Sequence, residues 1–353
     1  MQAIINNFKE GFTMKKKMLA MAMAAIMAVG VLSGCSSKVD ETTGDTAASD
    51  TAVTEASAEV SADVKIAYMA KNVVDAFAVK MNNYVSNQLD KMKDEGLITD
   101  WQLFDATSDP SIQVSELEDA INNGFNFFLL QPCEAAGSDP VVTRCKEKGF
   151  PCVVINSTTE STMQEASGYA GSDDVQAGEM MGKYILEKIP EGGTYVHMMG
   201  VVGNSAQVQR TEGINNTLTA EAGWTNGGDY AAEWLAEKAV GFATDAITQY
   251  GDELKAIVCD NDDMSSAVQA YCNSVNRSDI ICIGVDGNQG PLSMIKEGTL
   301  DATIYQDGEG QCDYAINTIA RALITGETDG VEMFKTDVPF ILVTKDNVDQ
   351  YLK

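Results

Sequence analysis

Residues 254–272 read LKAIVCDNDDMSSAVQAYC and combine the two patterns that decide the fold. Residues 256–259 are apolar on both faces, which is typical of a strand buried in a parallel sheet. Apolar residues then recur from Met264 at helical spacing, which predicts a helix. The polar run 260–263 lies where the strand would end. It has four possible roles: metal ligands, catalytic acids, a grip on a small polar ligand, or a helix cap.

The same alternation of strand and helix runs through most of the chain. Short apolar runs are followed by amphipathic stretches, the order typical of parallel sheets with helices on both faces. The expected strands are residues 64–70, 101–107, 125–132, 150–157, 194–200, 256–262, 281–287, 302–308 and 338–344. We therefore expect an α/β fold with two similar lobes, each a parallel sheet with helices on both faces. The late strands are available to cross between the lobes.

Lobe boundaries follow from this order of segments. We expect an N-terminal lobe from residues 64–172 plus about 307–338, and a C-terminal lobe from residues 173–306 plus about 339–353. Crossover hinge segments would join the two lobes.

The first 63 residues are predicted to be an address and a tether rather than part of the fold. Residues 1–34 are the expected signal peptide, with 14–34 as its true extent, because three lysines precede an apolar stretch there. Residues 32–35, LSGC, resemble a bacterial lipobox, so we expect cleavage before Cys35 and lipid on its sulfur. The alternative is an ordinary N-terminal membrane anchor. Residues 35–63 would then be the lipid-anchor cysteine and a disordered acidic tether.

Composition excludes several classes of function. The chain has 353 residues, 24 of them Lys or Arg and 52 Asp or Glu, and this acidic balance opposes binding to nucleic acid. The single histidine, His197, argues against histidine-based triads and multi-histidine zinc sites. We expect it to be a satisfied histidine on a strand. Seven cysteines besides Cys35 include no CxxC pair, and the sequence leaves their pairing open.

The familiar cofactor and metal motifs are missing or incomplete. No GxGxxG follows a strand, and residues 177–184, AGEMMGKY, lack the Ser or Thr of a P-loop. Residues 260–271 lack the central Gly and late Glu of a calcium loop. We therefore expect no cofactor, no metal and no catalytic residue. Asp262 or Asp263 could cap the helix beginning at Met264 while Asn261 faces a cleft.

Polar residues follow the expected strands, at the edge where open α/β sheets bind their ligands. They occupy residues 72–77, 156, 204–210, 260–263, 286–289 and 306–311. Taken singly, each has a plain structural explanation, namely a turn or cap aspartate, a surface arginine or a core aromatic residue. Taken together, they supply carboxylates, amides, one arginine and aromatic rings.

In their order and spacing these segments resemble the type I periplasmic sugar-binding proteins of ABC transporters, the ribose and galactose/glucose-binding group. The resemblance covers residues 64–345, and its most specific pieces are residues 201–213, 259–270, 282–288 and 298–307. It implies a sugar held between two closing lobes by hydrogen bonds and aromatic stacking. The residues implied to bind ligand are Asp75, Phe77, Asn156, Asn204, Arg210, Trp234, Asn261, Asp286 and Gln306.

The resemblance implies a binding protein rather than an enzyme. We expect an extracytoplasmic monomer, anchored by lipid to the outer face of the cytoplasmic membrane, that captures a monosaccharide and delivers it to ABC permease subunits. The chain departs from the family at Asn204 and Ala206, where the galactose/glucose branch has His and Asp, and at Ser157, where the ribose branch has Arg. The calcium loop of some galactose/glucose binders is replaced by residues 189–196, IPEGGTYV. These departures leave the identity of the sugar open.

Four other readings compete with this one. The same fold could serve a sensor that passes ligand state to a membrane kinase or chemoreceptor, or could bind a nucleoside-like or other polyhydroxylated solute. An exported carbohydrate-active enzyme would need two carboxylates flanking one bond. A cytoplasmic sugar-responsive repressor shares the fold, but the lipobox and the acidic charge argue against it.

Overall fold

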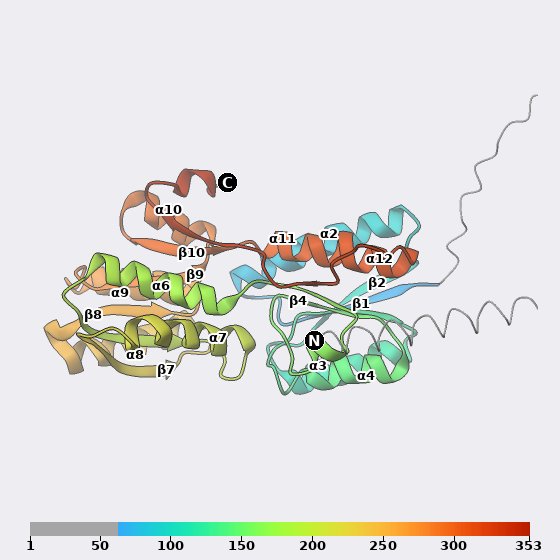
Figure 1. The fold of residues 1–353 in the computed structure, drawn as a ribbon, viewed down its shortest axis with the longest axis horizontal. Coiled ribbons are helices and arrows are strands. Elements are labelled where there is room, and N and C mark those ends of the chain that lie inside the picture. The colour runs from blue at the N-terminus through green and yellow to red at the C-terminus, as the bar shows by residue number, and fades with distance from the viewer. Residues whose placement is uncertain (1–62) are drawn as a thin grey trace, which may run out of the picture. The chain divides into compact units, whose positions relative to one another are not determined.

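The computed structural model describes residues 63–353, and within them two six-stranded sheets organise the fold (Figure 1). The first sheet has the order β11-β5-β4-β3-β1-β2 and the second has the order β12-β10-β9-β8-β6-β7. The expected signal peptide, Cys35 and the tether through residue 62 lie outside the described residues. Within residues 63–353, no helix has both the length and the apolar character needed to cross a membrane.

All strand pairs of the first sheet are parallel. Its strands are β1 (Lys65–Ala70), β2 (Asp100–Asp105), β3 (Phe127–Leu130), β4 (Cys152–Ile155), β5 (Gly168–Ala170) and β11 (Phe334–Lys335). Its helices are α2 (Ala76–Asp94), α3 (Pro110–Asn122), α4 (Asp139–Lys148), α5 (Thr162–Glu165), α11 (Gly308–Asp313) and α12 (Arg321–Thr325), with a π-helical segment, Tyr314–Ala320, between the last two.

The second sheet is parallel except at one edge. Its strands are β6 (Gly193–Met199), β7 (Trp224–Ala231), β8 (Leu254–Cys259), β9 (Ile281–Asp286), β10 (Ala302–Gln306) and β12 (Phe340–Thr344). Its helices are α6 (Asp174–Lys188), α7 (Ser205–Ile214), α8 (Ala236–Tyr250), α9 (Asp262–Ser274) and α10 (Gln289–Glu297), and short helical turns span Asn215–Thr219, Gly251–Glu253 and Val348–Gln350. β12 runs antiparallel to β10, because it comes directly from the first sheet and enters at the carboxyl end of β10.

Both faces of each sheet are buried, as the apolar runs predicted. Alternate residues of β1 pack on opposite faces: Tyr68 lies in one core with Met81 of α2, and Met69 lies in another with Leu117 of α3. Figure 1 shows α2, α11 and α12 on one side of the first sheet and α3 and α4 on the other. The second sheet likewise packs α6 on one face and α8 on the other. The prediction of two α/β lobes with mostly parallel sheets is confirmed.

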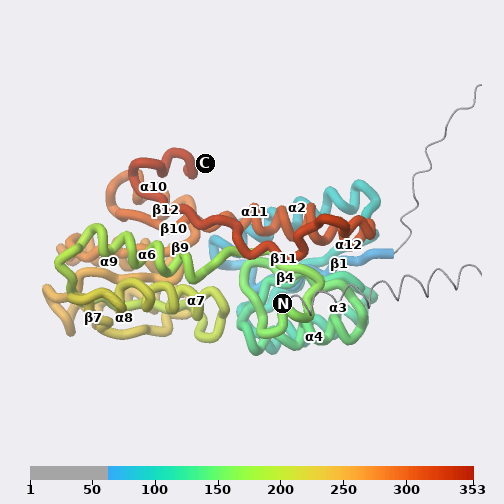
Figure 2. The backbone as a smooth tube through the Cα atoms, viewed as in Figure 1, coloured from blue at the N-terminus to red at the C-terminus, as the bar shows by residue number. Residues whose placement is uncertain are grey.

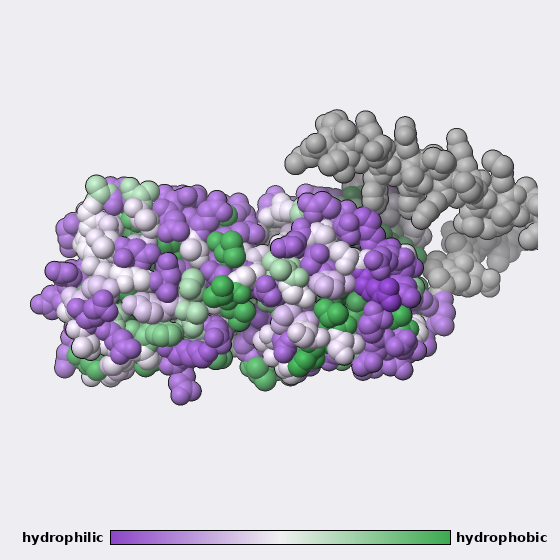
Figure 3. All heavy atoms as spheres, turned by 90° about the horizontal axis from the view of Figure 1, so that it is seen from below, coloured by the Kyte–Doolittle hydropathy of each residue, from purple (hydrophilic) through white to green (hydrophobic). Residues whose placement is uncertain are grey.

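The chain crosses between the two sheets three times, which can be followed in Figure 2. It leaves β5 for α6 and β6, returns from β10 to α11, and passes from β11 to β12. These three segments are the only covalent links between the sheets within residues 63–353. The face of the molecule seen in Figure 3 is mainly hydrophilic, with hydrophobic residues scattered among the polar ones, in keeping with the acidic composition.

Candidate functional site

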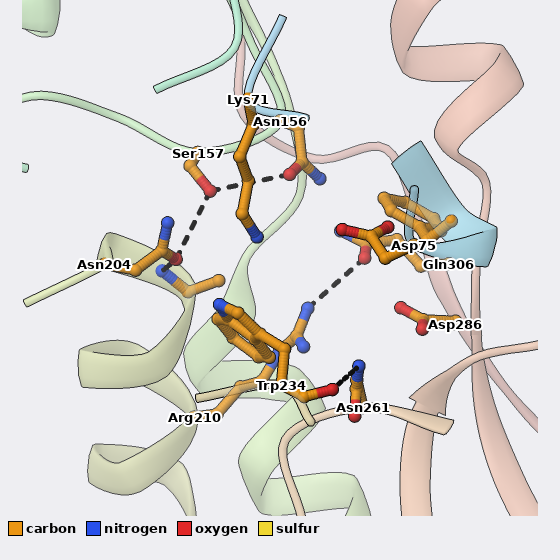
Figure 4. Close-up of a pocket in the computed structure, with 12 residues that line it drawn as sticks. Lys71, Asp75, Asn156, Ser157, Asn204, Arg210, Trp234, Asn261, Asp286 and Gln306 are labelled. Carbon is orange, nitrogen blue, oxygen red and sulfur yellow. Dashed lines mark hydrogen bonds between the residues drawn. The ribbon is translucent and has the colours of Figure 1, made fainter. Parts of the chain in front are cut away.

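One cavity collects the polar residues that follow the strands of both sheets (Figure 4). It has a volume of about 40 Å³. The nine residues singled out in the sequence all line it, namely Asp75, Phe77, Asn156, Asn204, Arg210, Trp234, Asn261, Asp286 and Gln306. The structure adds Lys71, Ser157 and Ala206 to the lining. The sequence therefore located the cavity, whereas ligand binding by these residues stays a prediction.

Three lining residues have a left-handed backbone that residues other than glycine rarely adopt. Their φ angles are +70° at Asn156, +67° at Trp234 and +137° at Asp286. Such conformations cost about 1–3 kcal/mol each and gather at functional sites, where the surrounding fold holds them in place. Strain at three positions around one cavity marks this edge of the sheets as functional.

Arg210 forms the most extensively bonded part of the cavity wall. It lies on α7, is buried, and donates from Nε to Asp174 at 2.9 Å. Its Nη1 donates to the main-chain carbonyl of Asp260, and its Nη2 donates to Gln306 Oε1 at 3.2 Å. The alternative of a surface arginine is therefore wrong. The sequence analysis did not single out Asp174, which lies 36 positions earlier in the chain.

Asp260 ties this wall to the only histidine of the chain. Its carboxylate accepts from the main-chain N–H of Gly200 at 2.8 Å and lies 2.8 Å from His197 Nε2. On the other side of the ring, Nδ1 is 3.5 Å from Asp229 without a well-aligned hydrogen bond. Burial alone would lower the pKa of His197, but the charges of Asp260 and Asp229 and the hydrogen bond to Asp260 outweigh burial and raise the pKa to about 9.

Three residues of the polar run 260–263 have different roles, and the bonds of Asp260 are those given above. Asn261 is the N-cap of α9, because its side chain accepts from the N–H of Met264 at 3.1 Å. Asp262 is fully buried and accepts from Thr303 and from the N–H groups of Gly287 and Asn288. The prediction that Asp262 or Asp263 caps a helix beginning at Met264 is therefore wrong: α9 begins at Asp262, and the cap is one residue earlier.

The carboxyl group of Asp286 faces the cavity and has few hydrogen-bond donors around it. It is 4% exposed, and the only hydrogen bond that its carboxylate accepts from the described residues comes from Asn288, at 3.3 Å. Burial, together with the charge of nearby Asp262, raises its pKa well above the usual range. A buried carboxyl group with few donors is suited to hydrogen bonds with hydroxyl groups of a ligand.

Two aromatic side chains line the cavity. Trp234 follows β7, and its ring packs so closely on Gly200 that a Cβ atom there would lie 2.2 Å from the ring. Phe77 lies in the first turn of α2, and its ring lies against Gly308, where a Cβ atom would be only 2.7 Å away. The close approach to glycine fixes both rings. Both rings also pack against hydrophobic cores, Phe77 in the first lobe and Trp234 in the second, so lining the cavity and packing on the core are compatible, and stacking on a ligand stays a prediction.

Hydrogen bonds close one side of the cavity across the two sheets. Ser157, which follows β4, donates to Asn204 Oδ1 at 3.4 Å, and the N–H of Thr158 donates to Ser205 at 2.8 Å. Asn204 also caps α7, because it accepts from the N–H of Ala206 at 3.0 Å. Polar groups of the two lobes therefore meet here.

Lys71 is the one charged lining residue that the sequence analysis missed. It directly follows β1, one residue before the polar segment 72–77. A lysine at the end of a strand looks like a solvent-exposed residue, so its charge drew no attention. The signal that would have found it is its position alone, because the residue after a parallel strand points to the ligand-binding edge.

No group of three or more His, Cys, Asp or Glu side chains within residues 63–353 is arranged to hold a metal ion. The seven cysteines of this part of the chain are all free and buried. The pairing question left open by the sequence therefore resolves to free thiols in this structure.

Comparison with known proteins gives one family and several relatives. Residues 66–328 match the family described as periplasmic binding protein domain. The xylitol-binding protein of Mycolicibacterium smegmatis is 28% identical over 69% of this chain and 68% of its own length. The ribose import binding protein RbsB of Escherichia coli is 23% identical over 71% of this chain and 81% of its own. A solute-binding protein of an ABC transporter from Agrobacterium vitis, solved with D-fucose, has a TM-score of 0.73 and 25% identity over 81% of this chain and 97% of its own.

Proposed function

The chain belongs to the periplasmic binding protein domain family, and we propose that it is an extracytoplasmic lipoprotein that captures a monosaccharide-like solute and delivers it to an ABC importer. The observation that carries the proposal is the single cavity lined by polar and aromatic residues from the carboxyl ends of both sheets. The relatives and the solved structures are binding proteins for sugars or polyols and not enzymes.

The lining of the cavity has the chemistry that a sugar ring needs. A pyranose has apolar C–H faces and a rim of hydroxyl groups. Phe77 and Trp234 offer rings for the faces, whereas Asp286 and Asn261 offer acceptor and donor groups for the rim. Because such groups are buried, a solute that lacks a matching hydroxyl would leave them unpaired and would bind more weakly.

The size of the cavity implies that the lobes open to admit a ligand. A volume of about 40 Å³ has room for roughly three water molecules, which is much less than a sugar ring occupies. We propose lobes of residues 64–172 plus 307–338 and 173–306 plus 339–353, which open about the three segments that cross between the sheets. The cross-sheet hydrogen bonds of Ser157 and Thr158 would break on opening and re-form on closure.

The place of action follows from the N-terminal segment. We propose that residues 14–34 direct export, that lipid on Cys35 anchors the mature chain, and that residues 36–63 tether the lobes near a permease. Replacing Cys35 by Ser should release the protein into the medium or periplasm and abolish labelling by a radioactive fatty acid. Retention of both membrane binding and label in the variant would contradict the lipid anchor.

A thermal-shift screen tests the proposal. The purified protein should be stabilised by about 2.7 kcal/mol at a hundredfold excess of its solute over the dissociation constant, by mass action. The screen covers pentoses, hexoses, deoxy- and amino-sugars, sugar acids, polyols and nucleosides. Asp286→Asn should lose the response, and the matched variant Asp301→Asn, at an exposed position outside the cavity, should keep it. No response to any member of the panel would contradict capture of a monosaccharide.

A further inference from the structure

Lys71 brings a cation into the cavity that forms no ion pair with an acid of the described residues. Its side chain enters from the end of β1, with Ser157 and Asn204 on one side and Asp75 on the other (Figure 4). Among residues 63–353, no carboxylate oxygen lies within 4.0 Å of its ammonium, and the ammonium donates no hydrogen bond. Its described neighbour is the ring of Trp234, whose centroid is 4.7 Å away. An unpaired cation is unexpected in a chain with 52 acidic and 24 basic residues.

The nearest acid of the lining is already used by the protein itself. Asp75 caps α2, and its Oδ1 accepts from the N–H of Ala78 at 2.6 Å. Its Oδ2 accepts from Asn72 at 2.7 Å. Lys71 therefore does not obtain its partner from the first loop, and burial of the ammonium lowers its pKa despite the charge of Asp75.

Two more donors in the cavity also have no acceptor. Trp234 Nε1 and Gln306 Nε2 are buried and make no hydrogen bond with the described residues. Gln306 is 1% exposed, so water in the bulk does not satisfy its amide. Both groups can only donate, as can an ammonium. Unsatisfied buried donors destabilise the protein without ligand, and a ligand with matching acceptors would recover that loss.

The positive charge is concentrated around the Trp234 ring. The guanidinium carbon of Arg210 is 6.0 Å from the centroid of the same ring that Lys71 approaches. Arg210 is paired with Asp174, so it fixes the wall, whereas Lys71 keeps all three of its N–H donors free. Asp286 and Asn261 lie across the cavity from Ser157 and Asn204 (Figure 4). The cavity thus has a cationic side with free donors and a carboxylate side.

We propose that the solute is an acidic monosaccharide, whose carboxylate binds at Lys71 and whose hydroxyl groups bind at Asp286 and Asn261. This inference rests on the proposed function, because it names the ligand class of the same cavity. A carboxylate accepts several hydrogen bonds and donates none, which matches the free donors of Lys71, Trp234 and Gln306. A neutral hydroxyl satisfies fewer of them and leaves the ammonium without a counter-charge.

Matched pairs of sugars test the inference by isothermal titration calorimetry on the purified protein. The pairs are D-glucose with D-glucuronate, D-galactose with D-galacturonate, D-ribose with D-ribonate and xylitol with D-xylonate. In at least one pair the acid should bind tenfold or more tighter than its neutral partner, the size of effect expected for one charge-assisted hydrogen bond. Lys71→Met should remove this preference, and Lys71→Arg should keep much of it.

Lys183→Met is the control, since Lys183 is an exposed lysine paired with Glu179 on α6. It should bind both members of each pair as the unsubstituted protein does, and the melting temperature of every variant shows whether it has folded. If neutral sugars bind as tightly as their acids or more tightly, the inference is overturned and the proposed function stands. If Lys71→Met keeps the acid preference, Lys71 does not carry it and the inference is again overturned. If no member of any pair binds, the inference falls, and the response to the wider thermal-shift panel decides whether the proposed function stands.

Discussion

Arg210 and Lys71 are the two cations of the cavity, and the protein treats them in opposite ways. Arg210 is 3% exposed and spends its donors on Asp174, on the carbonyl of Asp260 and on Gln306. The ammonium of Lys71 makes no ion pair or hydrogen bond among the described residues and lies 4.7 Å from the centroid of the Trp234 ring. Arg210 is held in the cavity wall by its bonds, whereas the ammonium of Lys71 can form new bonds with a ligand. The contrast shows that a charged residue in a cavity indicates ligand binding only when its bonds within the protein leave it free to bind.

Replacing Arg210 should have the largest effect on the free energy of unfolding. Arg210→Met leaves Asp174 buried without its counter-charge, so the free energy of unfolding should fall by about 3–5 kcal/mol. Urea unfolding followed by circular dichroism measures this change. The double variant with Asp174→Asn should recover part of the loss, because the uncompensated charge is gone. A loss below about 1 kcal/mol in the single variant would show that the wall is not held by this pair.

The histidine behind the wall should make stability depend on pH. In the folded protein His197 has a pKa of about 9, whereas an unfolded histidine titrates near 6.5. The charged ring therefore contributes fully below about pH 6.5, and its contribution, on the order of 3 kcal/mol, is lost as the pH rises through about 9.

Unfolding measured from pH 6 to pH 10 for the protein and for His197→Gln isolates this contribution. The difference in stability between the two should shrink across that window, since other groups, such as the buried cysteines, titrate in both. A difference that stays constant with pH would mean that His197 is neutral in the folded protein.

Displacing the tryptophan ring should weaken both folding and binding. A Cβ atom at Gly200 would lie 2.2 Å from the Trp234 ring, so Gly200→Ala should cost about 1–3 kcal/mol of stability. It should also reduce affinity for the solute about tenfold or more, as the stacking face moves. Gly241→Ala is the matched control, because a Cβ atom there meets nothing within 4 Å and a helix prefers alanine. Unchanged affinity in Gly200→Ala would argue against a stacking role for Trp234.

Removing the free cation should have the smallest effect on folding. The ammonium of Lys71 has no ion pair or hydrogen bond to lose. Lys71→Met should therefore change the free energy of unfolding by less than about 1 kcal/mol, or raise it, because the burial of a charge is relieved. Chemical denaturation without ligand measures this change. A loss as large as that of Arg210→Met would show that Lys71 has a bonded partner in the folded protein after all.

The sequence predicted what depends on order along the chain. Alternating strands and helices place the residues that follow each strand at one edge, so Asn156, Asn261, Asp286 and Gln306 were found from position together with family resemblance. The same rule also applies to Lys71, which directly follows β1, but a lysine at that position resembles a solvated residue and was not predicted to line the cavity. The alternation of strands and helices could not predict that β12 is antiparallel, because its direction depends on where the chain re-enters the second sheet.

What the sequence did not predict depends on partners far away in the chain. The run 260–263 shows this most clearly, since Asp260 meets His197 from β6 and Asp262 meets Thr303 from β10. Which acid is buried, which residue caps and which faces the cavity is decided by those non-local contacts. Four consecutive polar letters carry no trace of them.

A crystal structure of the protein with the solute that stabilises it most tests the central claim directly. The account predicts the solute in the cavity between the carboxyl ends of the two sheets, with a ring face on Trp234 and hydroxyl groups within hydrogen-bond distance of Asp286 and Asn261. A solute bound elsewhere, with this cavity empty and the lobes unchanged, would contradict the account.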